Sequence, residues 1–445
     1  MVRRTLALIV IAACGGAPPT AASPKPVPPP PQAPVTQEAG PEAKKAAEAI
    51  SRAFELLTQE SAVPGDPVTL REAAVEALAP RGWKARPIAW TNDPARDVEV
   101  LRGAVLTLAL RGELPADAVL RAARAMAVAI GDTQTFALSK ANVQGLFAMI
   151  AGVPVVQPGI LSHKLDDGRW AVSDVLPGSG AAGAGVQRGD ILVTADGTPI
   201  VHGYVDLIPF VGGAAGVKLE LVVERAGKNQ TINLALQPVA SPIVDWKALP
   251  GGVGYIRLWS CTRADDDARD AGKLVMAALG ELDRKKAKKL VLDLRGNPGG
   301  YPFDVASLLV ETDPLMVAVA NGADQPVART KLAAWKPKRP VAVLVDEQTA
   351  SGAEMVAFAL QDASAATIVG RPTAGGLSFP TTEKLSGEVT LSYPLSRVGS
   401  ARTKAPLDGN RLVPDIAAAN PSFDDYQTGH DPQLEAALAA LRSAH

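Results

Sequence analysis

Residues 340–362, with the sequence PVAVLVDEQTASGAEMVAFALQD, constrain the fold of this chain more than any other stretch. A β-branched apolar run at 341–345 lies between a proline and a polar cluster, which predicts a short buried strand. From Gly352 onward the apolar residues recur at helical spacing. A tight turn at 349–352 must therefore join a strand to a helix, a unit that is typical of α/β layer structures.

Ser351 lies at the entrance of this predicted helix, where backbone N–H groups have no intrahelical partner and the helix dipole is positive. That position suits a nucleophile whose attack creates an oxyanion. The same serine is followed by Glu354 at the spacing of a capping box, which is a purely structural motif. This stretch alone leaves open whether Ser351 is a nucleophile or a helix cap.

A second stretch, KLVLDLRGNPGG at residues 289–300, predicts a strand that runs into a glycine-rich turn. No side chain screens the backbone N–H groups of Gly299 and Gly300. Such a turn can hold an anion or an oxyanion. The alternative is an ordinary loop between a strand and a helix.

In this order, the two stretches resemble the C-terminal processing (tail-specific) serine peptidase family, which has a strand–DLRGNPGG turn followed by a strand–DE-x-TAS-x-x-E turn. The resemblance implies that Ser351 is the nucleophile. It also implies an oxyanion hole formed by the N–H of Gly352 and by the N–H of either Gly299 or Gly300. For the fold it implies a crotonase-like α/β core.

The resemblance gives two positions for the general base, and this chain differs at both. The segment GDTQTF resembles the D-x-H-T segment of one branch of the family, with Gln134 in place of the histidine that acts as base. In the serine–lysine branch a lysine follows the segment strand-G-x-P-T-x-G and a glutamine comes a few residues later; here these positions hold Gly376 and Pro380. A neutral amide cannot accept the proton of Ser351, so the base stays open. The candidate substitutes, if the fold brings any of them to the serine, are Lys140, Glu354, Glu383 and Lys384.

Residues 172–200 resemble a PDZ domain, with a strand, a Pro-Gly-Ser turn, a short helix, a Gly-Asp pair and an Asp-Gly turn. A G-x-G-x-x-G match at 178–183 is not followed by a crossover helix and does not predict a dinucleotide site. The PDZ resemblance implies a loop whose N–H groups bind the carboxylate of a peptide C-terminus, although Pro158 removes one donor. The residues of this loop are Gly159, Ile160 and Leu161.

The first 14 residues carry two arginines and a short apolar run that ends at Cys14. The run is too short for a bilayer, which needs about 20 residues, and indicates a secretory signal. The sequence IAAC resembles a lipoprotein box, which implies that Cys14 is lipidated; an ordinary cleaved signal is the alternative. The sequence thus predicts an exported lipoprotein of the bacterial cell envelope, held to the membrane by lipid alone.

Composition excludes some functions. A net charge of −1 argues against nucleic acid as the main partner, because phosphate binding needs a basic face. The four histidines lack metal-ligand spacing, so no metal is predicted, and no cofactor either. If Cys14 is lipidated, Cys261 has no disulfide partner, and we expect it to be an inert filler.

These patterns predict a multidomain α/β protein. A signal peptide (1–14) and a Pro/Ala-rich linker (15–41) precede an N-terminal helical domain (42–152), a PDZ domain built as a small β-sandwich or barrel with short helices (153–240), and a peptidase core with a C-terminal helix (241–445). Two functions remain open. One is a serine endopeptidase that captures unstructured C-termini in the PDZ domain and cleaves them at its serine. The other is an impaired or inactive descendant, a membrane-tethered protein that binds peptide tails.

Overall fold

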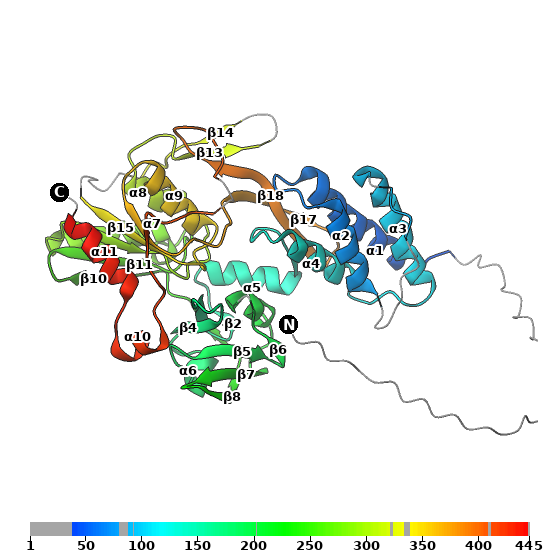
Figure 1. The fold of residues 1–445 in the computed structure, drawn as a ribbon, viewed down its shortest axis with the longest axis horizontal. Coiled ribbons are helices and arrows are strands. Elements are labelled where there is room, and N and C mark those ends of the chain that lie inside the picture. Colours follow the sequence, from blue (N-terminus) through cyan, green and yellow to red (C-terminus); the bar gives the residue numbers. More distant parts are fainter. Residues whose placement is uncertain are drawn as a thin grey trace, which may run out of the picture. The chain divides into compact units, whose positions relative to one another are not determined.

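The structure is a computed structural model and describes residues 38–79, 88–91, 93–201, 203–320, 324–332, 339–407 and 411–443. Cys14 and the predicted signal peptide lie outside the described residues, so the lipid anchor stays a prediction. Residues 39–445 pack as one unit, shown in Figure 1. Within the described ranges, no helix combines the length and the apolar character that a membrane span requires.

The N-terminal part is helical because its apolar residues recur at helical spacing and cover one another. Two of its helices begin at a proline that follows a capping aspartate: the side chains of Asp66 and Asp93 accept the N–H groups of Thr69 and Ala95. Leu391 and Tyr393, from the C-terminal part of the chain, complete this helical core. The helices are α1 (Pro41–Glu55), η1 (Leu56–Glu60), α2 (Pro67–Leu78), α3 (Pro94–Leu110) and α4 (Ala118–Ile130).

A mixed sheet forms the centre of the C-terminal part, in the order β10-β11-β12-β15-β16-β19. Only β10 is antiparallel to its neighbour, and the other neighbours are parallel. Because β12 and β15 are parallel and adjacent, the two turns singled out in the sequence leave the same edge of the sheet. The strands are β10 (Val244–Leu249), β11 (Val253–Leu258), β12 (Lys289–Asp293), β15 (Val341–Val345), β16 (Thr367–Gly370) and β19 (Ile416–Ala417).

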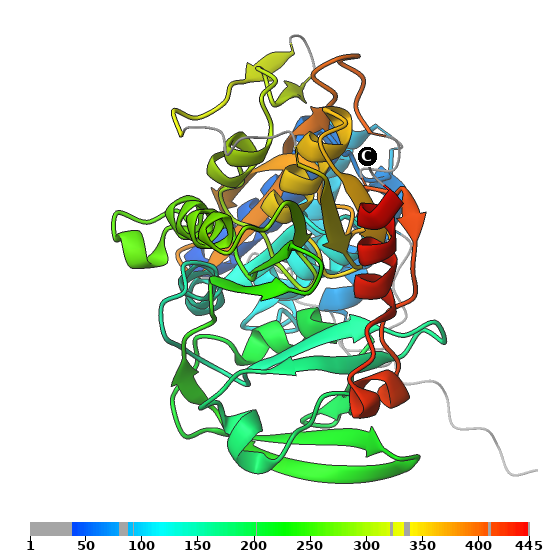
Figure 2. The same ribbon diagram turned by 90° about the vertical axis from the view of Figure 1, so that its left-hand side faces the viewer.

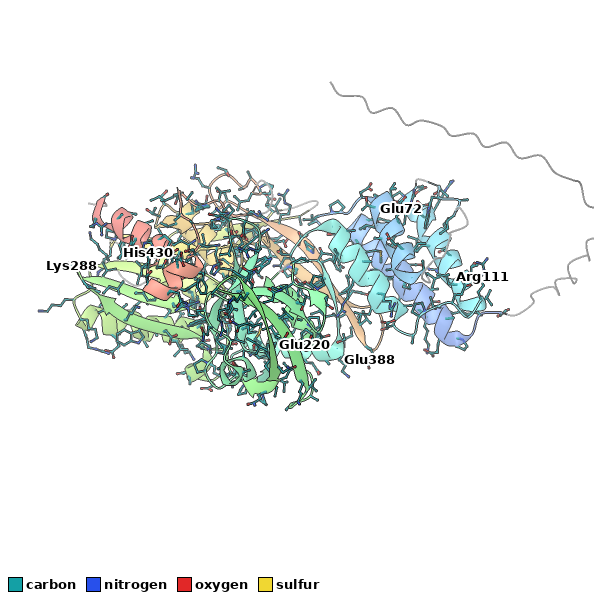
Figure 3. All side chains as sticks on the ribbon, turned by 60° about the horizontal axis from the view of Figure 1, so that its bottom comes forward. Glu72, Arg111, Glu220, Lys288, Glu388 and His430 are labelled. Atoms are coloured by element: carbon teal, nitrogen blue, oxygen red, sulfur yellow. The ribbon has the colours of Figure 1, made fainter. Side chains whose placement is uncertain are left out.

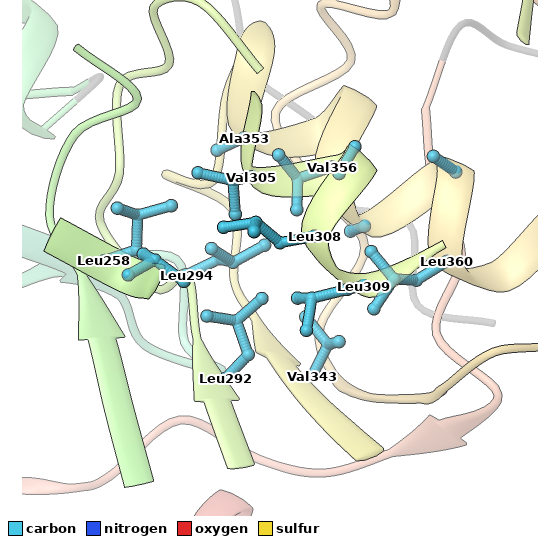
Figure 4. Packing of buried hydrophobic residues seen from close by; sticks show 14 of the residues in the cluster. Leu258, Leu292, Leu294, Val305, Leu308, Leu309, Val343, Ala353, Val356 and Leu360 are labelled. Carbon is cyan, nitrogen blue, oxygen red and sulfur yellow. The ribbon is translucent and has the colours of Figure 1, made fainter. Parts of the chain in front are cut away.

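Helices cover both faces of this sheet. The side chains of α7 (Ala271–Arg284), α8 (Phe303–Leu309) and α9 (Gly352–Asp362) share one large core with the strands. Figure 4 shows this packing at Leu292 and Val343, which meet Leu308 and Leu309 from α8. On the other face, α11 (Pro432–Ser443) closes a smaller core. The α/β layer structure is the one predicted from the alternation of strands and helices.

A second sheet joins the helical part to the C-terminal part. Its longest strand, β18, pairs with β1, β13 and β17, and β13 pairs with β14. The predicted helical region therefore also contributes a strand, β1, and a further helix, α5 (Lys140–Ile150). The strands are β1 (Phe136–Ser139), β13 (Met316–Val319), β14 (Gln325–Val327), β17 (Ser378–Lys384) and β18 (Val389–Gly399).

The segment that resembles a PDZ domain forms its own sheet and core, in the order β3-β4-β5-β7-β8. Strand β3 is at the edge of this sheet, as Figure 2 helps to follow. The elements are β2 (Val155–Gln157), β3 (Ile160–Lys164), β4 (Trp170–Val175), α6 (Gly180–Ala184), β5 (Ile191–Ala195), β6 (Thr198–Pro199), η2 (Gly203–Phe210), β7 (Lys218–Arg225), β8 (Lys228–Ala235) and β9 (Gln237–Val239).

Replacing Leu292 by alanine should lower the free energy of unfolding by about 2–5 kcal/mol, because it leaves a cavity under α8. The matched control is Leu395→Ala, since Leu395 on β18 is 56% exposed and should change stability by less than about 0.5 kcal/mol. Urea unfolding followed by tryptophan fluorescence measures both. Equal effects of the two variants would contradict the assigned core.

Candidate active site

Ser351 connects β15 to α9 through a strained turn. Its backbone has φ 52°, in the left-handed region that residues with a Cβ rarely adopt. Hydrogen bonds to the glycine-rich turn hold it there: Thr349 Oγ1 donates to the carbonyl of Leu294 at 3.0 Å, and the Ala350 N–H to that of Asn297 at 2.9 Å. The two turns predicted from the sequence are therefore directly bonded to each other.

The buried carboxylate of Asp346 fixes both turns at once. Its Oδ1 accepts the N–H of Gly296 at 3.0 Å and the N–H of Thr349 at 2.9 Å. Burial raises the pKa of Asp346 to about 6. This aspartate, which sequence analysis treated only as part of a motif, is thus the residue that sets the spacing between the turns.

The glycine-rich turn lies against Ser351 so closely that its glycines are required. Gly299 and Gly300 have φ 104° and 120°. A Cβ on Gly299 would be 2.7 Å from the Gly352 nitrogen and 2.8 Å from the Ser351 Cβ. A Cβ on Gly352 would in turn lie 2.3 Å from the Gly300 carbonyl oxygen. Any other residue at these positions would push the two turns apart.

Three N–H groups were candidates for the oxyanion hole, and they differ in their hydrogen bonds. The Gly299 N–H donates to Asn297 Oδ1 at 2.8 Å. In the part of the chain that the structure describes, the N–H groups of Gly300 and Gly352 have no acceptor. The side chain of Asn297 therefore occupies the N–H of Gly299, and the N–H groups of Gly300 and Gly352 are the two candidate donors that remain.

The two positions at which this chain differs from the family's bases meet at one place. A Cβ on Gly376 would be 2.4 Å from Gln134 Nε2 and 2.9 Å from Glu354 Oε2. The N–H groups of Ser351 and Gly376 both donate to that same Oε2, at 2.8 and 2.7 Å. Gln134 is buried beside the Ser351 turn and is no surface loop residue. Its amide fills space that a longer side chain at 376 would need.

Glu354 is buried and saturated with hydrogen bonds. Besides the two N–H groups on Oε2, its Oε1 accepts Thr373 Oγ1 at 2.5 Å and the Gly375 N–H at 2.9 Å. Burial raises its pKa to about 7, although these four donors oppose the shift. Glu354 thus closes the predicted capping box through the Ser351 N–H. Among the described side chains, none forms a hydrogen bond with the Ser351 hydroxyl.

The other substitute bases lie elsewhere. Glu383 and Lys384 end β17, opposite Leu391 and Thr390, and Leu391 packs into the N-terminal helical core. Lys140 is close to the same end of that sheet, since its N–H donates to the carbonyl of Glu388. The fold therefore does not bring these three side chains to the serine. Pro380 lies within β17 at a register shift, opposite Pro394.

The predicted peptide-binding loop leads into the edge strand β3. Gly159 has φ 77°, and a Cβ there would lie 2.2 Å from the Ser179 Cβ, so α6 packs directly on the loop. The Gly159 carbonyl accepts the N–H of Leu176 at 2.9 Å. Gly159 and Ile160 are buried, while Leu161 is half-buried. The loop is thus firmly held at the start of β3, which has a strand neighbour on only one side in the described part of the chain.

Cys261 is a free, fully buried cysteine, and burial raises the pKa of its thiol to about 12. Its backbone carbonyl accepts the N–H of Tyr301, directly after the glycine-rich turn. A thiol with such a pKa is not a nucleophile at neutral pH. Its surroundings agree with the inert role expected from the sequence.

Sequence analysis missed an ionic network behind the glycine-rich turn. Arg295 donates to both oxygens of Asp293 and of Asp431, at 2.6 to 3.0 Å. Arg295 also donates to Gln433 Oε1 at 3.0 Å. Asp431 also accepts the N–H of Leu434, in the first turn of α11. No sequence signal links it to an arginine so far away in the chain.

Replacing Glu354 by glutamine should lower the free energy of unfolding by about 1–3 kcal/mol, because the NH₂ group of the amide would then face backbone N–H donors. Urea unfolding measures the loss. Glu388→Gln, at an exposed carboxylate labelled in Figure 3, is the matched control and should stay within about 0.5 kcal/mol.

The raised pKa of Glu354 gives this loss a pH dependence. Between pH 4.5 and about pH 7, Glu354 stays protonated in the folded protein but is ionised in the unfolded chain. Raising the pH through this range therefore lowers the free energy of unfolding of the wild type. The glutamine variant lacks this titration. Its deficit relative to wild type should therefore be larger at pH 5 than at pH 8. A deficit that grows toward pH 8 would mean that folding lowers the pKa.

Comparisons with known proteins agree with the geometry. The model of peptidase family S41 matches residues 252–418, and a PDZ domain model matches residues 171–225. A carboxyl-terminal-processing protease of Synechocystis sp. is 31% identical over 283 residues, which cover 60% of this chain and 63% of that protein. A carboxy-terminal-processing protease of Bartonella bacilliformis is 30% identical over 269 residues, covering 57% and 59%. The chain thus spans about half to two thirds of the length of the curated relatives it matches.

A solved structure shows the same fold. The photosystem II D1 C-terminal processing protease superposes with a TM-score of 0.52 at 23% identity, over 78% of this chain and 93% of that one. The predicted family and the multidomain α/β fold class are confirmed, whereas the lipoprotein signal stays a prediction. The chain thus carries a PDZ domain ahead of a domain of peptidase family S41, and it is similar to carboxyl-terminal-processing proteases.

Proposed function

We propose that this chain is a serine endopeptidase that acts on unstructured polypeptide C-termini, with Ser351 as its nucleophile. The observation that carries the proposal is the contact between the two turns, in which the backbone of Gly300 packs against Gly352, the residue after the serine. Two preorganised donors are what the oxyanion of an acyl-transfer intermediate requires. The strained strand-to-helix turn is typical of nucleophilic serines.

The weak part of this machinery is proton transfer. Attack by Ser351 Oγ on a carbonyl carbon requires that the hydroxyl lose its proton. Gln134 and Gly376 have no group that can accept it, and the oxygens of Glu354 already accept four hydrogen bonds. An oxyanion hole and substrate binding alone retain roughly 10³–10⁴-fold acceleration over water. We therefore expect a slow peptidase.

Capture of the substrate is assigned to the PDZ domain. The loop at Gly159–Leu161 would hold the free carboxylate through N–H groups, and the tail would add a strand to the edge at β3. The preferred ligand is an extended tail with a free carboxylate and an apolar last residue. Support comes from the position of β3 at the sheet edge and from the rigid packing of Gly159 on α6.

A second function, peptide binding without cleavage, is favoured by one observation. The side chain of Gln134 fills the space beside Gly376 and Glu354, so both of the family's base positions are occupied without a base. In that case the oxyanion hole would be a remnant, and the protein would act as a tethered PDZ module. The two functions differ in one measurable property, cleavage that depends on Ser351.

Two variants separate these functions. Ser351→Ala should abolish any cleavage of an unstructured peptide with an apolar C-terminal residue. Gln134→His should raise cleavage by about 10²–10⁴-fold, the usual contribution of a positioned general base, because an imidazole can take the proton. Gln134→Asn is the matched control, since it keeps a neutral amide. Peptide cleavage followed by mass spectrometry measures all of them.

If wild type and Gln134→His are both as inactive as Ser351→Ala while peptide binding survives, the binding module is the better account. Wild-type turnover that disappears in Ser351→Ala, with no gain in Gln134→His, would mean that another group is the base. Glu354, whose Oε2 accepts the Ser351 N–H, would then be replaced next.

We also propose that the mature protein is an exported lipoprotein anchored through Cys14, because a short apolar run precedes that cysteine and a proline-rich stretch follows it. Replacing Cys14 by serine should release the protein from membranes or block its processing. Cys261→Ala, which removes the only other cysteine, should leave both unchanged. Membrane fractionation and labelling with a fatty-acid analogue provide the measurement. A Cys14→Ser protein that is still labelled and membrane-bound would disprove the anchor.

A further inference from the structure

A segment of the C-terminal part, residues 420–428, packs on the edge of the PDZ domain; we call it the strap. It contains α10 (Phe423–Thr428), which lies against the PDZ strands in Figures 1 and 2. His163 Nε2 lies 3.0 Å from the Pro421 carbonyl oxygen, and the Tyr426 hydroxyl lies 3.0 Å from His163 Nδ1. Burial lowers the pKa of His163 to about 4, so its ring is neutral and takes both bonds. The strap is thus bonded to β3 itself.

The hydrogen bonds around β3 show which of its backbone groups face outward. The Gly159 carbonyl accepts the N–H of Leu176, and the Leu165 N–H donates to the carbonyl of Arg169. The backbone N–H and C=O groups of the odd-numbered residues of β3 therefore point toward β4. Val172 lies opposite Ser162, but its N–H donates to the Asp190 carbonyl and its own carbonyl accepts the N–H of Gly189, both on the side away from β3. The backbone groups of Ser162 therefore have no partner in Val172. Backbone direction alternates along a strand. The groups that an added strand can pair with therefore belong to Ile160, Ser162 and Lys164.

The last of these three positions is already occupied. Asn420 Nδ2 donates to the Lys164 carbonyl oxygen at 2.6 Å. The rest of the Asn420 amide is also bonded: Nδ2 donates to Glu347 Oε2 at 2.7 Å, and Oδ1 accepts from Gln433 Nε2 at 2.8 Å. Asn420 is 9% exposed. Residues of the C-terminal part thus fix the orientation of the Asn420 amide, which occupies one backbone acceptor at the edge of the PDZ sheet.

From this geometry we infer that Asn420 is a specificity-determining residue that ends the peptide ladder on β3, so that the PDZ domain recognises only about the last four residues of a tail. The inference rests on the proposed PDZ capture. A carboxylate held at Gly159–Ile160 makes the tail run antiparallel to β3, toward Lys164. The tail can pair with Ile160 and Ser162, but at Lys164 it meets the strap. Residues further from the C-terminus therefore add no ladder hydrogen bonds.

The test uses free-acid peptides of increasing length with one apolar C-terminal residue, titrated into the full chain carrying Ser351→Ala to prevent cleavage. We expect affinity to rise up to four residues and then to change by less than about twofold up to eight. In Asn420→Ala, which frees the Lys164 carbonyl, a longer peptide should gain about threefold to tenfold, the effect of one further hydrogen bond. Gln361→Ala, which removes another amide bonded to the C-terminal part, is the matched control and should leave the length dependence unchanged.

Backbone methylation makes the test position-specific. Methylating the amide opposite Lys164, about the fifth from the C-terminus, should not affect wild type but should cancel the gain in Asn420→Ala. Methylation opposite Ser162, about the third, should weaken binding to both proteins. Asn420→Ser, too short to reach Lys164, should behave like Asn420→Ala, and circular dichroism checks that both variants are folded.

Different failures point to different errors. Wild-type affinity that keeps rising beyond four residues, or equal sensitivity of wild type and Asn420→Ala to methylation opposite Lys164, would overturn the role of Asn420 while leaving PDZ capture intact. Equal binding of free-acid and amidated peptides, or no binding of any peptide to any variant, would overturn PDZ capture and with it this inference.

Discussion

The candidate site depends on one buried carboxylate. Asp346 accepts an N–H from the turn after β12 and another from the turn after β15. A buried carboxylate that accepts such bonds is costly to leave unpaired, so the two turns are held at a fixed distance. Ser351 can keep a strained backbone of about 1–3 kcal/mol only because this frame over-determines it. The contact of Gly299 and Gly300 with the serine follows from the same frame.

The sequence predicts what is local. The short β-branched run before Ser351, the helical spacing after it and the glycines of the second turn each imply a local structure, and parallel neighbouring strands bring the turns together. The sequence does not predict which backbone N–H group will donate a hydrogen bond to a given side chain. Asn297 bonds to the Gly299 N–H, and this decides between two adjacent glycines that local patterns leave equivalent.

Contacts between distant segments escape sequence analysis for a different reason. Gln134 and Gly376 meet because β1 and β17 both pair with β18, a tertiary arrangement with no periodicity to reveal it. The strap is short and polar, and Asn420 is one ordinary residue in it. Its importance comes only from its three partners, on the PDZ edge, the Ser351-bearing loop and α11.

The structure therefore separates two parts of the proposed acyl-transfer site. The oxyanion donors belong to turns of the central sheet and are fixed by Asp346 and Thr349. The base positions belong to loops beside the second sheet, next to β1 and β17. Because the two parts rest on different strands, a chain with Gln134 and Gly376 at the base positions can lack a proton acceptor and still keep the N–H groups of Gly300 and Gly352 in place. In the proposed peptidase, intact oxyanion donors would thus be no measure of the catalytic rate. The rate would depend on whether a side chain at position 134 can accept the proton of the Ser351 hydroxyl.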